Sequence, residues 1–175
     1  MSDAMTPPSS TSPAAVAASD LAAAEVAATA AALATPFVQS LVRLLRAQDG
    51  FGAWEGRSDA KLLAPYIVTR EQRRAMPIMG DPSPEVLWRV EQYYGAVGLA
   101  IEHHTGLVAS PMIQMHREGF GRVILTVGKL VVLSRHLRDV HRFGFESLAA
   151  LAAGGEKLVA GCVATIETYP EVARA

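Results

Sequence analysis

Hydrophobic positions recur along the chain at two different periods, and the change of period separates helical segments from strands. Between residues 36 and 106 apolar side chains return every three or four positions. The clearest such run starts at Ser83-Pro84 and ends at Gly106. An N-cap serine, a proline in the first turn and a glycine after the last turn are typical of a helix. The sequence therefore predicts a long helix with the stripe Leu87, Val90, Tyr94, Val97 and Ile101.

Three shorter helices are predicted before it. Thr35-Pro36 is an N-cap followed by a first-turn proline, and apolar residues at helical spacing follow as far as Leu45. Ser58 is the expected cap of a second helix that buries Leu62, Leu63 and Ile67. Thr69 and Gln72 have the spacing of a capping box, and Pro77 stops the helix that they open.

After Gly106 the period changes from 3.6 to 2. Residues 112–116, 122–127 and 130–134 are rich in strand-forming side chains and are separated by turns that contain glycine. Three antiparallel strands in a meander are the simplest arrangement. A last helix is expected from Phe145 to about Thr168. We expect Gly154-Gly155 to bend or break it, because two glycines cost about 2 kcal/mol relative to two alanines in a helix.

These segments predict an α+β fold, a mostly helical single domain with a small three-stranded antiparallel β-meander. The expected domain spans residues 36–175, after a disordered tail at 1–13 and an alanine-rich helical extension at 14–35. Ser19 and Asp20 are candidate N-caps of this extension, and Leu21, Val26 and Leu33 form a thin apolar face. Whether the extension packs on the domain is left open.

Composition and charge narrow the possible functions. The net charge of −1 argues against a general nucleic-acid binder. The single cysteine, Cys162, excludes an internal disulfide and a metal site built on cysteines alone, and it favours a reducing cytoplasm. Cys162 lies on an apolar stripe, so we expect a core residue and not a nucleophile. We expect neither a secretory signal nor a membrane span.

Cationic side chains concentrate in one stretch of the sequence, residues 116–142. Such a surface suits an anion: a phosphate, a carboxylate-rich metabolite or a negatively charged metal cluster. The alternative is a solvated sheet face whose arginines pair with acids on the helices. The candidate ligand-binding residues are His116, Arg117, Arg122, Arg135, Arg138, His141 and Arg142.

Evidence for metal chemistry or catalysis is weak in the sequence. It contains no H-E-x-x-H, no Cys-x-x-Cys and no P-loop. A metal could still be gathered from His116 and His141 with Met112 or Met115. Phe51 and Trp54 lie in a glycine loop that could dock a partner or cover the core.

Several stretches are similar to a known family when they are taken together. They are residues 41–49, 62–67, 69–74, 80–82, 118–122, 137–145 and 169–173. From residue 36 to residue 175 the chain resembles the NifX-associated nitrogen fixation proteins, a bacterial family of unassigned biochemical activity. The resemblance implies the cytoplasm of a nitrogen-fixing bacterium and an accessory role beside nitrogenase. It transfers no catalytic residues.

Three functions remain open at this point. The first is a non-enzymatic binding protein that assists nitrogenase assembly or cofactor handling, with the nitrogenase cofactor or an iron–sulfur precursor as a transient anionic ligand. The second is a module that docks on a nitrogenase component or a NifX-like carrier through Phe51 and Trp54. The third is an enzyme that uses arginine, histidine and Asp139. No nucleic-acid or membrane partner is expected, and the free edges of a small sheet permit a homodimer.

Overall fold

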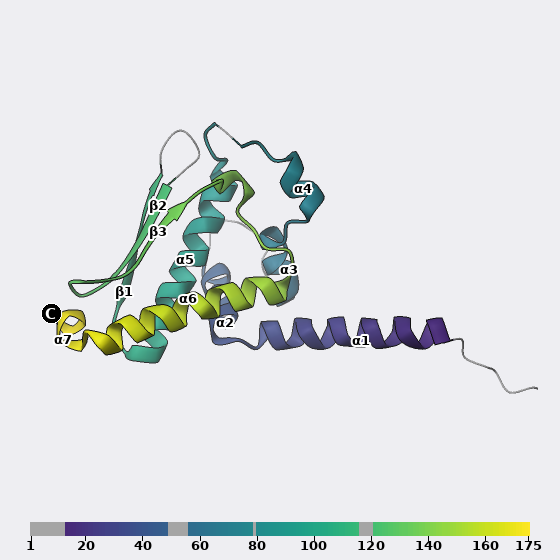
Figure 1. Cartoon of the computed structure of the whole chain (residues 1–175), viewed down its shortest axis with the longest axis horizontal. Coiled ribbons are helices and arrows are strands. Elements are labelled where there is room, and N and C mark those ends of the chain that lie inside the picture. The colour runs from purple at the N-terminus through teal and green to yellow at the C-terminus, as the bar shows by residue number, and fades with distance from the viewer. Residues whose placement is uncertain (1–12, 49–55, 79, 116–120) are drawn as a thin grey trace, which may run out of the picture.

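The computed structural model describes residues 13–48, 56–78, 80–115 and 121–175. Figure 1 shows helices gathered on one side of a small sheet. The elements in chain order are α1 (Pro13–Leu33), α2 (Pro36–Arg46), α3 (Asp59–Leu63), η1 (Ala64–Tyr66), α4 (Arg70–Ala75), α5 (Pro84–Thr105), β1 (Ala109–Met115), β2 (Gly121–Val127), β3 (Leu130–Leu137), η2 (Val140–Arg142), α6 (Leu148–Thr168) and α7 (Pro170–Arg174).

The sheet is an antiparallel meander of order β1-β2-β3, so the predicted α+β fold and its meander are confirmed. Alternate residues of β2, namely Val123, Leu125 and Val127, are buried. They face the helices, because β1 packs on α5 and β3 packs on α6. The register places Arg135 opposite Val123, so Arg135 lies on the helix-facing side of the sheet.

Helix α5 forms the centre of the core and has the caps that the sequence predicts. Ser83 Oγ accepts a hydrogen bond from Val86 N, and Gly106 adopts a left-handed conformation with φ 69°. That conformation favours glycine because it has no Cβ. In the predicted stripe, Leu87 is half-buried and the other four residues are buried, from Val90 to Ile101.

The shorter helices also begin where their caps predict. Thr69 and Gln72 form both hydrogen bonds of the capping box at the start of α4. Ser58 precedes α3, in which Leu62 and Leu63 are buried. Ile67 is only half-buried, because it has left the helix and forms a parallel bridge with Phe145.

The expected break in the last helix is wrong, since α6 runs without interruption through Gly154 and Gly155. A Cβ on Gly155 would lie 2.1 Å from Cδ1 of Phe37, so the missing side chain makes room for α2 against α6. Packing of Phe37 offsets the intrinsic cost of glycine in the helix. The helix starts at Leu148, later than predicted, because Phe145 pairs with Ile67.

Helix α1 projects away from the rest of the molecule (Figure 1). It begins at Pro13, so Ser19 and Asp20 lie inside the helix and do not cap it. Leu21 and Val26 are 64% and 70% exposed. Within residues 17–33 only Ala32 is buried, beside the contacts of α1 with α2 and α6.

Length and composition by themselves do not exclude a membrane span among the described residues. Helix α6 is long and apolar enough to cross a membrane by these two measures, and α1 and α2 together reach the same threshold with a 71° bend between them. In the structure, Leu151, Val159, Cys162 and Ile166 of α6 are buried in the core. A helix with one face in such a core is typical of a globular domain.

Candidate anion-binding site

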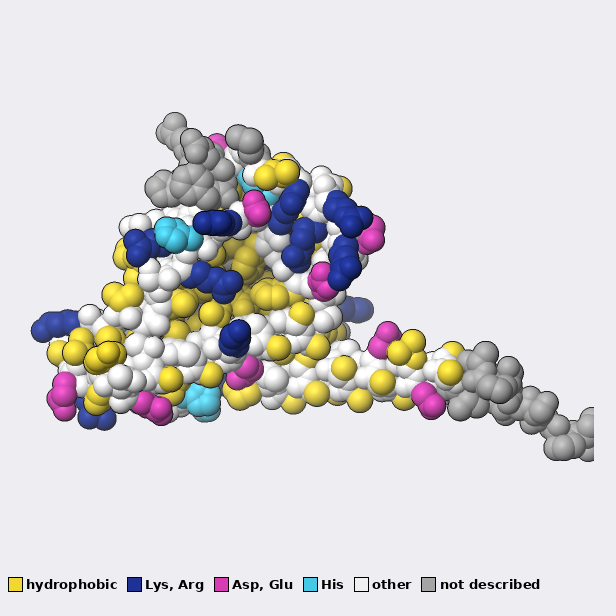
Figure 2. All heavy atoms as spheres, in the orientation of Figure 1, with side chains coloured by type: hydrophobic (Ala, Val, Ile, Leu, Met, Phe, Trp, Pro, Cys, Tyr) yellow, Lys and Arg dark blue, Asp and Glu magenta, His cyan; other side chains and the backbone are white. Residues whose placement is uncertain are grey.

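A cavity of about 610 Å³ opens where α4, α5 and α6 meet the end of β3 and the segment after it. Figure 2 shows this region as a hollow with hydrophobic side chains at its floor and Lys and Arg side chains on both sides. Its volume lies in the range of small-molecule sites. The lining residues are Arg73 from α4, Val90, Tyr93 and Tyr94 from α5, Gly154 from α6, and 135–140 and 142–145 between them.

Backbone hydrogen bonds join the two segments that form the wall. Val68 N donates to Phe145 O at 2.8 Å, and Phe145 N donates to Tyr66 O at 2.8 Å. Arg73 Nη2 donates to Gly144 O at 3.0 Å. These bonds hold α4 beside residues 143–145, although the two segments are far apart in sequence.

The segment that carries the arginines after β3 has a defined conformation. Asp139 adopts a left-handed backbone with φ 51°, and Arg142 N donates to Asp139 O at 2.8 Å. His141 is buried, with 6% exposure, and its Nε2 lies 2.9 Å from Gly80 O. Left-handed conformations in residues other than glycine are uncommon and cluster at functional sites. Together these contacts position Arg138 and Arg142.

Aromatic rings form the floor, with Tyr93 at their centre. The centroid of its ring lies 5.1 to 5.4 Å from those of Phe37, Tyr94, Phe143 and Phe145. Burial raises the pKa of Tyr93 and of Tyr94, and the nearby charge of Arg135 offsets part of this increase. Both phenols are therefore neutral at physiological pH and can donate a hydrogen bond.

The charge of the lining is strongly positive, because it contains four arginines and a single acid, Asp139. None of the four arginines forms an ion pair with an acid among the described residues. The Nε atoms of Arg73 and Arg142 are buried and have no hydrogen-bond partner there. A buried donor without a partner costs about 1–3 kcal/mol, more when it is charged, and such groups are rare in folded proteins.

The structure places some of the candidate residues from the sequence in the cavity and others elsewhere. Arg135, Arg138 and Arg142 line the cavity, and His141 lies behind it as a positioning residue. Arg122 is on the opposite, exposed face of the sheet, where its guanidinium donates to Ser134 Oγ at 2.7 Å. His116, Arg117, Phe51 and Trp54 lie outside the described residues.

Sequence reasoning missed the other half of the site. Arg73 belongs to the short helix α4, and Tyr93, Tyr94, Phe143 and Phe145 have the character of core residues. The available signal was the group Arg70, Arg73 and Arg74 around the capping box, a second cluster of cations outside residues 116–142.

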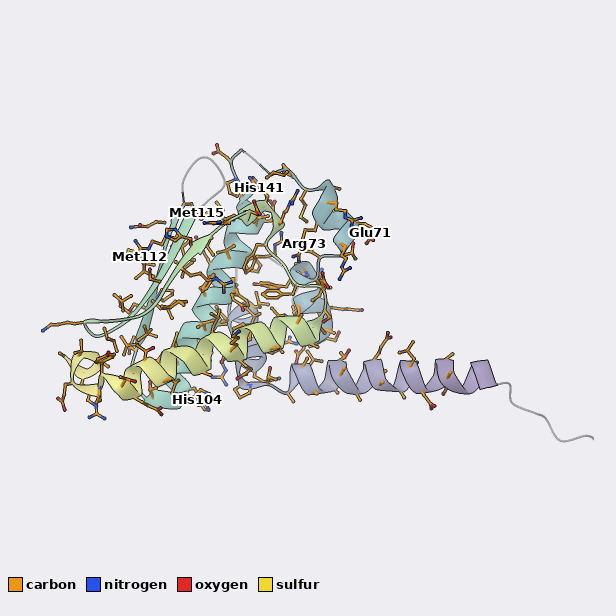
Figure 3. The ribbon with its side chains drawn as sticks, viewed as in Figure 1. Glu71, Arg73, His104, Met112, Met115 and His141 are labelled. Atoms are coloured by element: carbon orange, nitrogen blue, oxygen red, sulfur yellow. The ribbon has the colours of Figure 1, made fainter. Side chains whose placement is uncertain are left out.

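The described residues contain no group of three or more His, Cys, Asp or Glu side chains that could hold a metal ion. Met112 and Met115 lie on β1, and Figure 3 places His141 apart from Met112, near the end of β3. Cys162 is buried, and burial raises the pKa of its thiol to about 11. Anion binding in this cavity would therefore rely on arginine and tyrosine donors.

Comparisons with known proteins give the family. The family model described as "Protein of unknown function, DUF269" matches residues 54–174. Among curated relatives, the "UPF0460 protein in nifX 3'region" of Rhodobacter capsulatus is 56% identical over 81% of this chain and 90% of its own length. The "UPF0460 protein in nifX-nifW intergenic region" of Frankia alni is 45% identical over 81% of this chain and 96% of its own.

A solved structure extends the likeness to three dimensions. It is a crystal structure from the cyanobacterium Cyanothece 51142, described as a protein associated with nitrogen fixation from the DUF269 family. The two chains are 39% identical with a TM-score of 0.78, over 81% of this chain and 93% of the other. Both of these curated relatives are named for positions beside nifX, so the resemblance seen in the sequence is confirmed, and the chain belongs to the DUF269 family.

Proposed function

We propose that this protein is a non-enzymatic binding protein of the cytoplasm that holds an anionic species during nitrogenase assembly or cofactor handling. The observation that carries the proposal is the arginine-lined cavity, whose four arginines stand against one described acid and form no ion pair with an acid among the described residues. A bound anion would supply the acceptors that this lining lacks.

The surroundings of the arginines support binding of an anion over the alternative of a solvated face. Arginines on a solvated face would pair with acids of the helices, as Arg70 pairs with Glu146 at 3.3 Å outside the cavity. Inside the cavity the described acids are limited to Asp139. The names of the relatives support the pathway, since two are called after nifX and the solved one is described as associated with nitrogen fixation.

The proposal can be tested on protein purified without oxygen from a nitrogen-fixing host. Metal analysis and native mass spectrometry would detect a bound iron or molybdenum species, or another anion, as metal above background or as added mass. We expect the bound species to be lost from an Arg138→Ala, Arg142→Ala double variant. It should remain with Arg122→Ala, because Arg122 lies on the other face of the sheet.

Loss from Arg122→Ala with retention in the double variant would contradict the cavity as the site. Loss from neither variant would mean that the arginines do not hold the species at all. Circular dichroism of each variant separates failed binding from failed folding.

A second function, a docking module for a nitrogenase component or a NifX-like carrier, is favoured by the open face of the sheet. Met112 and Val131 are 49% and 51% exposed, and the register places them on the same face of the sheet as Arg122. Apolar patches on a protein surface often mark interaction sites. Co-purification with a partner that survives high salt would favour this function, because salt weakens binding that depends on charge.

A further inference from the structure

The chemistry of the cavity points to one class of anion. We infer that the cavity binds an organic polycarboxylate, a small molecule with two or more carboxylates on a carbon skeleton, through the guanidiniums of the four arginines that line it. The inference rests on the proposed binding role of this cavity and adds the identity of the group that the arginines recognise.

The donors match carboxylates in number and in kind. The N–H groups of a guanidinium form a fork whose spacing fits the two oxygens of one carboxylate. In Arg142 the Nε is enclosed by the protein, so the Nη groups are the donors that remain for a ligand. Arg73 uses Nη2 on Gly144 O and has Nη1 for a ligand. Four arginines in one cavity can hold more than one carboxylate.

The floor of the cavity favours a ligand with a carbon skeleton. Tyr93, Phe143 and Phe145 lie beneath the arginines, with Val90 and Val140 beside them. Such side chains gain free energy by covering carbon and hydrogen, whereas a bare inorganic anion would leave them against water. The two neutral tyrosines lie within this floor and suit a hydroxyl or carboxylate of the same molecule.

Two other ligand classes fit the described residues less well. A cluster held by coordination needs thiolate, imidazole or carboxylate ligands in a group, and the described part of the chain offers no such group. Phosphate sites commonly use backbone N–H groups at the start of a long helix or in a glycine loop. The described lining has neither feature. Its two glycines do not form a glycine loop, because Gly154 lies inside α6 and Gly144 packs closely against the side chain of Val68.

The test compares two defined probes, tricarballylate (propane-1,2,3-tricarboxylate) and inorganic phosphate, by calorimetry on the full chain at equal ionic strength. We expect tricarballylate to bind at least about tenfold more tightly than phosphate.

Arg142→Lys should weaken the binding of tricarballylate about tenfold or more, because lysine keeps the charge and loses the fork. Arg43→Lys, on the exposed face of α2, is the matched control and should leave the affinity unchanged. Saturation-transfer NMR should show contact between aromatic protons of the protein and the methylenes of tricarballylate.

The outcomes test the inferred ligand class separately from the proposed function. Phosphate binding as tightly as tricarballylate, or unchanged affinity in Arg142→Lys, would overturn the inference. If neither probe binds, but a metal species from the nitrogen-fixing host is lost with Arg138→Ala, Arg142→Ala, the inference fails and the proposed function stands. If no species depends on these arginines, both fail. Arg138→Met changes an exposed side chain and provides a second test in case Arg142→Lys does not fold.

Discussion

At Gly155 a missing side chain decides how closely α2 and α6 approach each other. Phe37 occupies the space that a Cβ would take, and the ring of Phe37 in turn contacts Tyr93 at the floor of the cavity. One glycine therefore connects helix packing to the shape of the site. Gly161 lies in the same helix with open space around it. The two positions have the same intrinsic propensity and different surroundings.

We expect Gly155→Ala to destabilise the protein by about 1–3 kcal/mol, because the new methyl group overlaps Phe37. Gly161→Ala should instead stabilise it by about 0.5–1 kcal/mol, because alanine is the better helix former and no atom lies within 4 Å of its Cβ. Urea denaturation of both variants measures the difference. Equal effects of the two changes would contradict the packing role of Gly155.

A second expectation at the residue scale concerns Cys162, whose thiol pKa is raised by burial from 9.0 to about 11. We expect the folded protein to react slowly with a thiol reagent at pH 8 and rapidly once unfolded in urea. Folding favours the neutral thiol, so its contribution to stability is complete below pH 9 and is lost as the pH rises toward 11. Cys162→Ala should therefore show a shallower loss of stability between pH 9 and 11. Fast labelling of the folded protein would contradict this burial.

At the scale of elements, α4 links a local cap to the site. Its capping box satisfies the first backbone donors, and the helix carries Arg73 to the cavity wall. None of its residues is fully buried, so little packing holds it in place. Short helices of this kind depend on their caps and on contacts with neighbouring segments.

Thr69→Ala should destabilise α4 by about 1 kcal/mol, since the side-chain acceptor for Gln72 N is lost. We expect faster amide hydrogen exchange at residues 70–75 and several-fold weaker binding of tricarballylate, because Arg73 is held less firmly. Thr168→Ala is the control: the hydroxyl of Thr168 bonds Ala164 O near the end of α6 and does not cap a helix start. Unchanged exchange in α4 would show that contacts other than the capping box hold it.

At the scale of the whole molecule, a compact α+β body carries the site and α1 extends from it (Figure 1). The core runs from Phe37 on α2 through α5 and the sheet to Ala173 on α7. Among the described residues of α1, Ala32 belongs to this core and Leu33 packs against it. The loss of stability on N-terminal truncation should therefore increase sharply once the deletion passes from the end of α1 into α2.

Deletion of residues 1–28 should leave the melting temperature of the body nearly unchanged, because the described side chains that it removes are exposed. Deletion of residues 1–38 also removes Phe37 and Val38, both buried. Loss of a buried aromatic residue alone costs about 3–5 kcal/mol, which lowers the melting temperature by several degrees. Differential scanning calorimetry measures both. A large decrease for the shorter deletion would mean that α1 supports the body.

The sequence by itself determined the starts of α2, α3, α4 and α5 and the strand order, because these depend on signals within a few residues. Pro84 and Gly106, the Thr69–Gln72 box and the alternation along β2 all act through local backbone geometry. Arg135, Arg138 and Arg142 could be nominated because they are close together in the sequence and share a charge.

Only the tertiary structure decided which of these residues form one site. Arg73 joins Arg142 because backbone bonds between residues 66–68 and Phe145 bring distant segments together. Arg122 separates from Arg135 because pairing with Val123 turns Arg135 to the helices, and Arg122 points the other way. The continuity of α6 depended on the ring of Phe37. Each of these outcomes comes from a contact between residues far apart in the chain, which local periodicity and capping signals do not report.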